Sequence, residues 1–199
     1  MKIYTISEDI KAELAELTRQ ADELSASFKT EFVCLAGCSG CCETFLWNLV
    51  EIINVREDKK YSTTLKKLHK RIKAYNREYH RRKKIMGDAS NDFDIFSTFF
   101  KDLRCIFLHD SKCLVYENRP ILCRLYASRD KERCAGLHEL SPDYHERANH
   151  ILMQTLMLNS RYTQLFHPGY TVQGLPFRYL MMEETAKTSG AATPNFNKG

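Results

Sequence analysis

The chain has no apolar run approaching the ~18 consecutive residues that a membrane-spanning helix requires. Its first residues, Met1 to Asp9, become acidic at once and contain no apolar segment of the secretory type. Strand patterns are weak, and there is no internal repeat, glycine-rich phosphate loop or nucleophile elbow. We therefore expect a cytoplasmic, reducing location, and the sequence gives no support to an enzyme built on either of those motifs.

With 199 residues and an apolar fraction of 43%, the chain is large enough to bury one hydrophobic core. We predict a single cysteine-cluster domain over residues 1–185, with a basic helical insertion at about 56–86. The last segment, 186–199, is small and polar, and its composition predicts a disordered tail.

The formal net charge of +5 is unevenly distributed. Thirteen lysines and arginines but only three acidic residues lie between Arg56 and Lys84, so this segment has a net charge of +10. A nucleic acid or an acidic protein is a conceivable partner, with Tyr75 and Tyr79 available to stack on bases. We favour the simpler interpretation, a solvated helical face whose apolar stripe, tyrosines included, packs on the rest of the domain.

Hydrophobic periodicity predicts a mainly α fold that is loop-rich near the cysteines. Apolar residues recur at three- and four-residue intervals from Ser7, a helix-capping residue type, to about residue 30. Further helices are expected around residues 45–53, from about 62, and over 93–103. A short helix opened by Pro120 carries Cys123, and Ser141 marks another helix start.

Eight cysteines dominate the chemistry of the chain. In a reducing compartment, cysteines at such short spacing are more often metal ligands than disulfides. The small Ser39-Gly40 pair allows the tight turn that brings neighbouring thiolates to one centre. The cysteines fall into two clusters, Cys34, Cys38, Cys41 and Cys42, and Cys105, Cys113, Cys123 and Cys134.

An all-thiolate ligand set suits zinc or an iron–sulfur cluster, and eight thiolates suffice for one centre or two. Adjacent side chains diverge, so Cys42 is expected to serve a different iron, a second centre or a bridging role if Cys41 also binds. His109 lies between Cys105 and Cys113, but we favour a solvated loop histidine over a ligand. The three-cysteine loop favours an iron–sulfur cluster, of the 4Fe–4S type, over zinc.

Two motifs carry a resemblance to a known family. The first is the four-cysteine loop, and the second is Cys105-Ile-Phe-Leu and Cys113-Leu-Val-Tyr116 followed by Arg119-Pro120-Ile-Leu-Cys123-Arg124. Over residues 32–127 the chain resembles the bacterial CxxCxxCC cysteine-cluster family, which is described as zinc- or iron-chelating. The resemblance implies ligands at Cys34, Cys38, Cys41, Cys42, Cys105, Cys113 and Cys123. Cys134 lies beyond the motif, and the basic insertion departs from the family pattern.

Tyr116, Arg119 and Arg124 lie within the matched motif and are candidates to contact the bound group without ligating metal. Guanidinium groups near clustered thiolates would stabilise the negative charge and donate hydrogen bonds to sulfur. The alternative is that both arginines cap carbonyl groups or form surface ion pairs.

We predict that the two clusters converge on one centre, because a centre held by Cys34–Cys42 alone leaves the second cluster unexplained. The predicted role is redox chemistry, metal handling or assembly. One alternative is methyl transfer from S-adenosylmethionine, since flagellin lysine N-methylases resemble this chain across Phe32–Cys42. Another is a nucleic-acid-binding module built on the basic helix.

Overall fold

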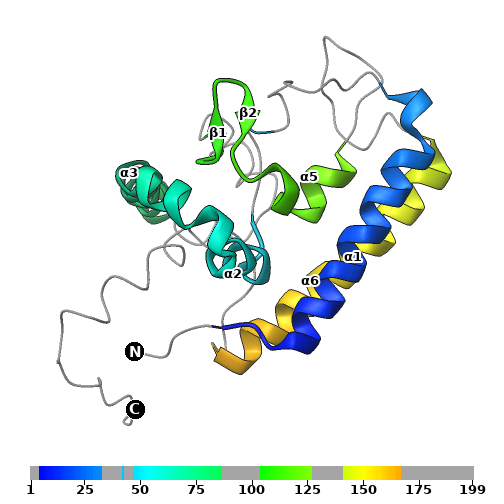
Figure 1. The fold of residues 1–199 in the computed structure, drawn as a ribbon, viewed down its shortest axis with the longest axis horizontal. Coiled ribbons are helices and arrows are strands. Elements are labelled where there is room, and N and C mark those ends of the chain that lie inside the picture. Colours follow the sequence, from blue (N-terminus) through cyan, green and yellow to red (C-terminus); the bar gives the residue numbers. More distant parts are fainter. Residues whose placement is uncertain (1–4, 33–41, 43–46, 87–103, 127–140, 167–199) are drawn as a thin grey trace.

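The computed structural model describes residues 5–32, 42, 47–86, 104–126 and 141–166 (Figure 1). Over these residues the chain forms five α-helices, short 3-10 turns and one two-stranded hairpin. The mainly α fold expected from the sequence is confirmed. No helix within the described ranges is both long and apolar enough to span a membrane.

Helix α1 (Glu8–Ser27) begins where the sequence predicts, at Ser7. The Ser7 hydroxyl oxygen accepts a hydrogen bond from the Ile10 amide at 3.5 Å, and Glu8 and Asp9 complement the positive end of the helix dipole. One face of the helix is buried, and its core residues have the predicted spacing: Leu14, Leu17, Ala21 and Leu24. Burying a leucine side chain contributes roughly 1.5–3 kcal/mol, so this face is the main reason the helix docks.

Helix α6 (Pro142–Phe166) lies antiparallel beside α1 (Figure 1). The Tyr162 hydroxyl donates to the carbonyl oxygen of Thr5 at one end of the pair, and Tyr144 lies near Ser25 at the other. Ser141 caps the start of α6, because its hydroxyl accepts a hydrogen bond from the Tyr144 amide at 3.4 Å. The predicted helix start at Ser141 is thus confirmed.

Helix α2 (Leu49–Glu57) is almost wholly buried and is held against α6. Its N-terminus is closed by a reciprocal capping box between Asn48 and Glu51. The Val50 amide donates to the side-chain oxygen of Asn159 on α6 at 3.2 Å. A 3-10 turn, η3 (Lys59–Tyr61), then leads into α3 (Ser62–Met86), the long basic helix that the sequence predicts.

Cys113 and Cys123 lie on a hairpin and a short helix, and Cys105 lies just before the hairpin. Strands β1 (Leu108–His109) and β2 (Lys112–Cys113) pair antiparallel, and the turn between them places Asp110 and Ser111 at positive φ, 46° and 59°. A 3-10 turn, η5 (Tyr116–Asn118), and helix α5 (Ile121–Leu125) follow. Pro120 is the N-cap of α5, one residue before the position that the sequence suggests.

Helix α5 packs against the antiparallel helices α1 and α6, which we call the helical pair, and so places Cys123 beside them. Several predictions fall outside the described residues: Cys34, Cys38, Cys41 and Cys134, the helix over 93–103, and the tail over 186–199. They remain predictions.

Candidate metal centre

The two cysteine clusters are joined by a backbone contact. The amide of Cys105 donates a hydrogen bond of 2.8 Å to the carbonyl oxygen of Cys42. Cys42 ends the first cluster and Cys105 begins the second, so this bond brings together residues 63 positions apart in sequence. Cys42 therefore lies beside Cys105, whereas Cys34, Cys38 and Cys41 lie outside the described residues.

Cys105, just before the hairpin, and Cys113, on strand β2, have equivalent backbone settings. The Phe107 amide hydrogen-bonds to the Cys105 sulfur, and the Val115 amide hydrogen-bonds to the Cys113 sulfur, in each case from two residues further along the chain. The Trp47 indole also hydrogen-bonds to Cys105. Donors aimed at sulfur lower a thiol pKa and stabilise the thiolate form that metals bind.

Burial opposes these donors and is the stronger effect. It raises the pKa of Cys105 to about 12, and it raises the pKa values of Cys113 and Cys123 as well. The four thiols that the structure describes are also electrostatic neighbours: Cys42 and Cys113 raise the pKa of Cys105, and Cys42, Cys105 and Cys113 raise that of Cys123. Without a bound cation, the thiols of Cys105, Cys113 and Cys123 are therefore protonated at neutral pH.

The side chains that the structure describes do not form a complete metal site. Within this part of the chain, no three His, Cys, Asp or Glu residues are arranged to hold a metal ion. Cys42, Cys105, Cys113 and Cys123 are half-buried and outside any disulfide, and the other four predicted ligands lie outside the described ranges. The donor set is nonetheless chemically suited to a thiophilic ion, because protons can leave in exchange for a soft cation.

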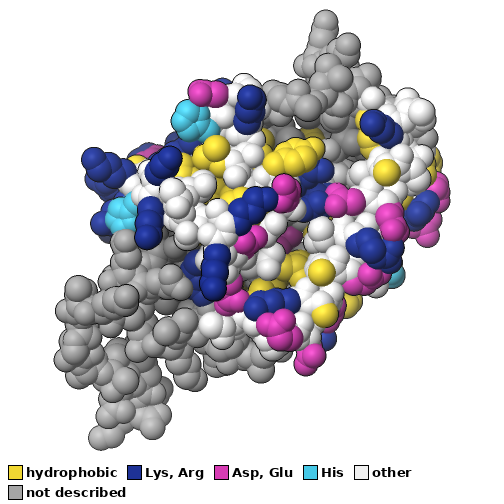
Figure 2. All heavy atoms as spheres, in the orientation of Figure 1, with side chains coloured by type: hydrophobic (Ala, Val, Ile, Leu, Met, Phe, Trp, Pro, Cys, Tyr) yellow, Lys and Arg dark blue, Asp and Glu magenta, His cyan; other side chains and the backbone are white. Residues whose placement is uncertain are grey.

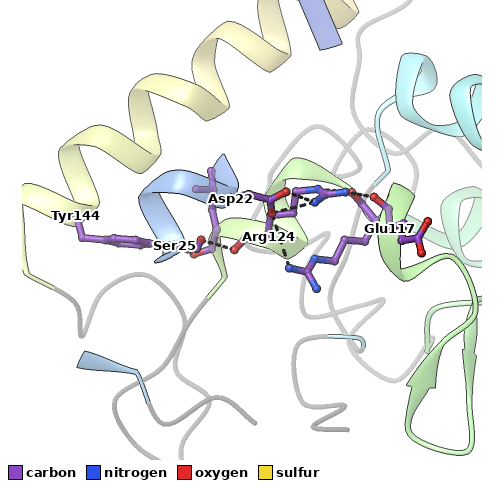
Figure 3. A network of polar contacts seen from close by, with 7 residues as sticks. Asp22, Ser25, Glu117, Arg124 and Tyr144 are labelled. Atoms are coloured by element: carbon purple, nitrogen blue, oxygen red, sulfur yellow. Dashed lines mark hydrogen bonds and ion pairs between the residues drawn. The ribbon is translucent and has the colours of Figure 1, made fainter. Parts of the chain in front are cut away.

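Arg124, the residue after Cys123, is the centre of a network of polar contacts (Figure 3). Its Nη1 donates to both carboxylate oxygens of Asp22 on α1, at 2.9 and 2.6 Å. Its Nε donates to the carbonyl oxygen of Arg119 at 3.1 Å, and its Nη2 donates to that of Glu117. The side chain thus caps carbonyl groups and pairs with a carboxylate, and its charge still lowers the pKa of Cys113.

The carbonyl groups at the end of α5 are capped by two hydroxyls from the helical pair. Ser25 on α1 donates to the carbonyl oxygen of Arg124 at 2.7 Å, and Tyr144 on α6 donates to that of Leu125 at 2.7 Å (Figure 3). The Tyr144 ring also packs edge-on against Phe28 and Phe32. These contacts fix the short helix that carries Cys123.

Arg119 and Tyr116 form a stacked pair at the edge of this network. The guanidinium carbon of Arg119 lies 3.9 Å from the Tyr116 ring centroid, and Tyr116 is exposed. The Arg119 Nη2 lies 4.0 Å from the nearer carboxylate oxygen of Asp22, and its buried Nε has no hydrogen-bond acceptor among the residues described. The charge of Arg119 lowers the pKa of Cys113 more than that of Arg124 does.

Glu51 is a further residue of the site, in contact with α5 and electrostatically coupled to Cys123. Its carboxylate accepts hydrogen bonds from the amides of Ile121, at 2.8 Å, and Asn48, at 3.3 Å. Burial raises the pKa of Glu51, and its negative charge raises the pKa of Cys123. The Asn48-x-x-Glu51 capping pattern can be recognised in the sequence. The burial of Glu51 against α5, however, depends on tertiary structure. A cavity of about 230 Å³ lies here, and its lining includes Glu51, Arg119 and Arg124.

Arg71 on α3 holds the segment from Cys105 to Leu108 in place. Its guanidinium donates to the carbonyl oxygens of Leu108, at 2.6 Å, and Cys105, at 2.9 Å. Among the many cations of α3, no sequence signal marks this one. His109, by contrast, is exposed on the hairpin and lies 3.0 Å from Asp110, which agrees with the solvated-histidine interpretation.

Buried, mutually interacting thiols on a hairpin and a helix are features of a cysteine-rich metal-chelating domain. A family model described as "Putative zinc- or iron-chelating domain" matches residues 33–150, more than half of the chain. The chain belongs to this family, the CxxCxxCC family. Neither a curated protein nor a solved structure gives a significant match.

Proposed function

We propose that this protein holds one iron–sulfur cluster or zinc ion through thiolates from both cysteine clusters. The observation that carries the proposal is the Cys105–Cys42 hydrogen bond, because it joins the clusters independently of any metal. The thiols of Cys42, Cys105, Cys113 and Cys123 are the proposed ligands among the described residues. Cys34, Cys38 and Cys41 are the proposed remaining ligands. Cys134, which lies beyond the family motif, is proposed as an additional one.

The all-cysteine ligand set and the three-cysteine loop favour an iron–sulfur cluster, of the 4Fe–4S type, over zinc. Such a cluster supplies one-electron redox chemistry, and burial together with N–H donors to sulfur sets its potential. The chain's own contribution is to release thiol protons, to bury the Cys105 and Cys123 thiols in part, and to offset the thiolate charge with Arg119 and Arg124. A role in redox chemistry, metal handling or assembly follows from this arrangement.

Anaerobic purification followed by absorption spectroscopy and analysis of iron, sulfide and zinc tests the proposal directly. A brown protein with iron and acid-labile sulfide would support the cluster, and a colourless protein with stoichiometric zinc would reverse that choice while keeping the chelating function. A folded protein with neither metal would refute both. A Cys105→Ser variant provides the matched comparison, because its metal content should fall while its helical signal persists.

Methyl transfer from S-adenosylmethionine is the alternative enzyme function. The cavity beside Glu51, at about 230 Å³, is smaller than the roughly 300–1,000 Å³ usual for ligands of that size. This cavity therefore does not favour the alternative. Calorimetric titration decides it: micromolar binding of S-adenosylmethionine that disappears in Cys34→Ser would establish a cluster-dependent transferase instead.

A further inference from the structure

Helix α3 has a buried inner face and an exposed, basic outer face. Its inner face buries Leu68, Ile72 and Tyr79 in the body of the protein, and Arg71 ties the helix to the carbonyls of Cys105 and Leu108. Its outer face carries, besides the ion-paired Arg81, six exposed basic side chains that we call the α3 cationic face: Lys66, Lys67, Lys70, Lys73, Arg77 and Lys84. Figure 2 shows Lys and Arg side chains crowded over the end of the molecule where α3 lies.

Within the described residues, the charge of the α3 cationic face is not neutralised. None of the six side chains forms a hydrogen bond or ion pair with another described residue. The helix contains a single acidic residue, Glu78, and it is already engaged with Arg81 and Arg82 at 2.7 Å each. The described part of the chain therefore supplies no counter-charge to this face.

Such a surface is unfavourable in the isolated helix. Lys66 and Lys70, Lys70 and Lys73, and Lys73 and Arg77 are like-charge pairs at i,i+3 or i,i+4 spacing, each costing about 0.2–0.5 kcal/mol. A polyanion that neutralised several of these charges at once would relieve this repulsion. From Lys66 to Lys84 the row extends about 27 Å at 1.5 Å per residue.

The rest of this face indicates which polyanion fits. Ala74 is the one apolar residue among the exposed positions from Ser62 to Lys84 that the structure describes, and the exposed Ile85 lies only at the end. An acidic protein would need aromatic or apolar anchors at the centre of the interface. A membrane would need an apolar helix face, and in α3 that face is already buried.

The two tyrosines that the sequence suggested for base stacking are not on this face. Tyr79 is only 2% exposed, and Tyr75 is partly buried near Cys105, so burial raises the pKa of its hydroxyl. Binding of unpaired bases relies on accessible aromatic rings. A duplex instead offers a rigid row of phosphates, and its major groove admits an α-helix.

We propose that the α3 cationic face binds the phosphate backbone of a nucleic-acid duplex. Recognition is through lysine and arginine contacts to phosphate, without base stacking and so with little sequence preference. Arg71 keeps the face turned outward by fixing the inner side of the helix to the cysteine hairpin. This inference is independent of the metal centre.

Fluorescence anisotropy with labelled 20-base-pair DNA and RNA duplexes of one sequence tests the proposal on the full chain. We expect binding at 50 mM salt that weakens steeply with salt, with a log–log slope of about −5 if all six cations contact phosphate. Either duplex alone would meet the expectation and would identify the nucleic acid. No binding at 50 mM salt, tighter binding to the matching single strand, or binding only to anionic vesicles or polyglutamate would overturn it.

The deciding comparison uses two triple variants with the same loss of charge. Lys66→Gln, Lys70→Gln and Lys73→Gln remove three charges from α3, and glutamine preserves helix propensity. Lys29→Gln, Lys112→Gln and Arg147→Gln remove three exposed charges elsewhere. The α3 triple should weaken binding at least tenfold and reduce the slope by about 3, whereas the control triple should change affinity much less. Equal losses in the two triples would overturn the proposal, and circular dichroism verifies that both are folded.

Discussion

Cys42 and Cys105 are joined through their backbones, with the Cys105 amide donating to the Cys42 carbonyl oxygen at 2.8 Å. The bond closes a loop that contains α2 and all of α3. Closing a loop of this length costs conformational entropy, which a single hydrogen bond of about 1 kcal/mol offsets only in part. Metal ligation by thiolates on both sides of the Cys42–Cys105 junction would stabilise the closed loop further.

We predict that Cys42→Ser and Cys123→Ser each lose metal and lose similar stability, because each removes one side of the same metal-held junction. Ligands cannot converge in the unfolded chain, so bound metal should contribute several kcal/mol to the free energy of unfolding. Metal analysis and thermal melting of purified variants provide the measurement. His109→Ala, at an exposed hairpin position, is the control and should match the unmodified protein.

Melting of the metal-free proteins separates this effect from ordinary packing. Without metal, the two cysteine variants should be about as stable as the metal-free unmodified protein. If Cys123→Ser instead keeps its full metal content and melting temperature, the clusters act independently and the proposed convergence is wrong.

The sequence was informative where structure is local. The periodic apolar residues of α1 and the capping residues Ser7 and Ser141 predicted helices that the structure confirms. The stripe on α3 was also predicted, and Tyr79 is buried within it. Each of these depends on interactions within about four positions, which a single sequence displays directly.

The polar contacts around the candidate site could not be predicted from such local patterns. Asp22 and Arg124 lie 102 positions apart, and nothing in the local pattern of α1 distinguishes Asp22 from its other acidic residues. Arg71 likewise looked like one more surface cation of α3, but it binds two carbonyls of the cysteine hairpin. Such pairings follow from the way α5 and the hairpin dock, which is a tertiary property.

The second prediction concerns pH. The pKa of Cys105 is raised by burial to about 12, above the value of about 8.5 expected for an unfolded thiol. A group with a raised folded pKa stabilises the folded state fully below its unfolded pKa, and this stabilisation is lost as pH rises toward the folded value. The metal-free, reduced protein should therefore be less stable at pH 9.5 than at pH 7.5, by up to about 1.4 kcal/mol for each such thiol.

Urea denaturation with reductant and chelator, at both pH values, measures this loss. Cys105→Ala should show a smaller difference between the two conditions, because one of the titrating thiols is gone. The metal-loaded protein should instead become more stable as pH rises from 6 to 8.5. Its thiolate ligands have released their protons in the folded state, and they take protons up when the protein unfolds. Metal-free stability that stays level or rises toward pH 9.5 would contradict the prediction.

The third prediction concerns Arg124, whose buried guanidinium binds Asp22 and two carbonyl oxygens. Arg124→Met retains the apolar stem but leaves the carbonyls of Glu117 and Arg119 without this donor. We expect a loss of about 3 kcal/mol, at the lower end of the range for a broken buried pair because the Asp22 side chain is half exposed. Arg124→Lys should recover only part of the loss, since an ammonium group cannot reproduce the planar fork of donors.

Arg19→Met is the matched control, because Arg19 also pairs with carboxylates on α1 but is exposed. Its effect on stability should be small, as is usual for surface ion pairs. Metal affinity provides a readout specific to the site: the positive charge of Arg124 lowers the pKa of Cys113, so Arg124→Met should also weaken metal binding whereas Arg19→Met should not. Equal stabilities for the two methionine variants would show that the Asp22–Arg124 pair does not anchor α5, and Cys123 with it, to the helical pair.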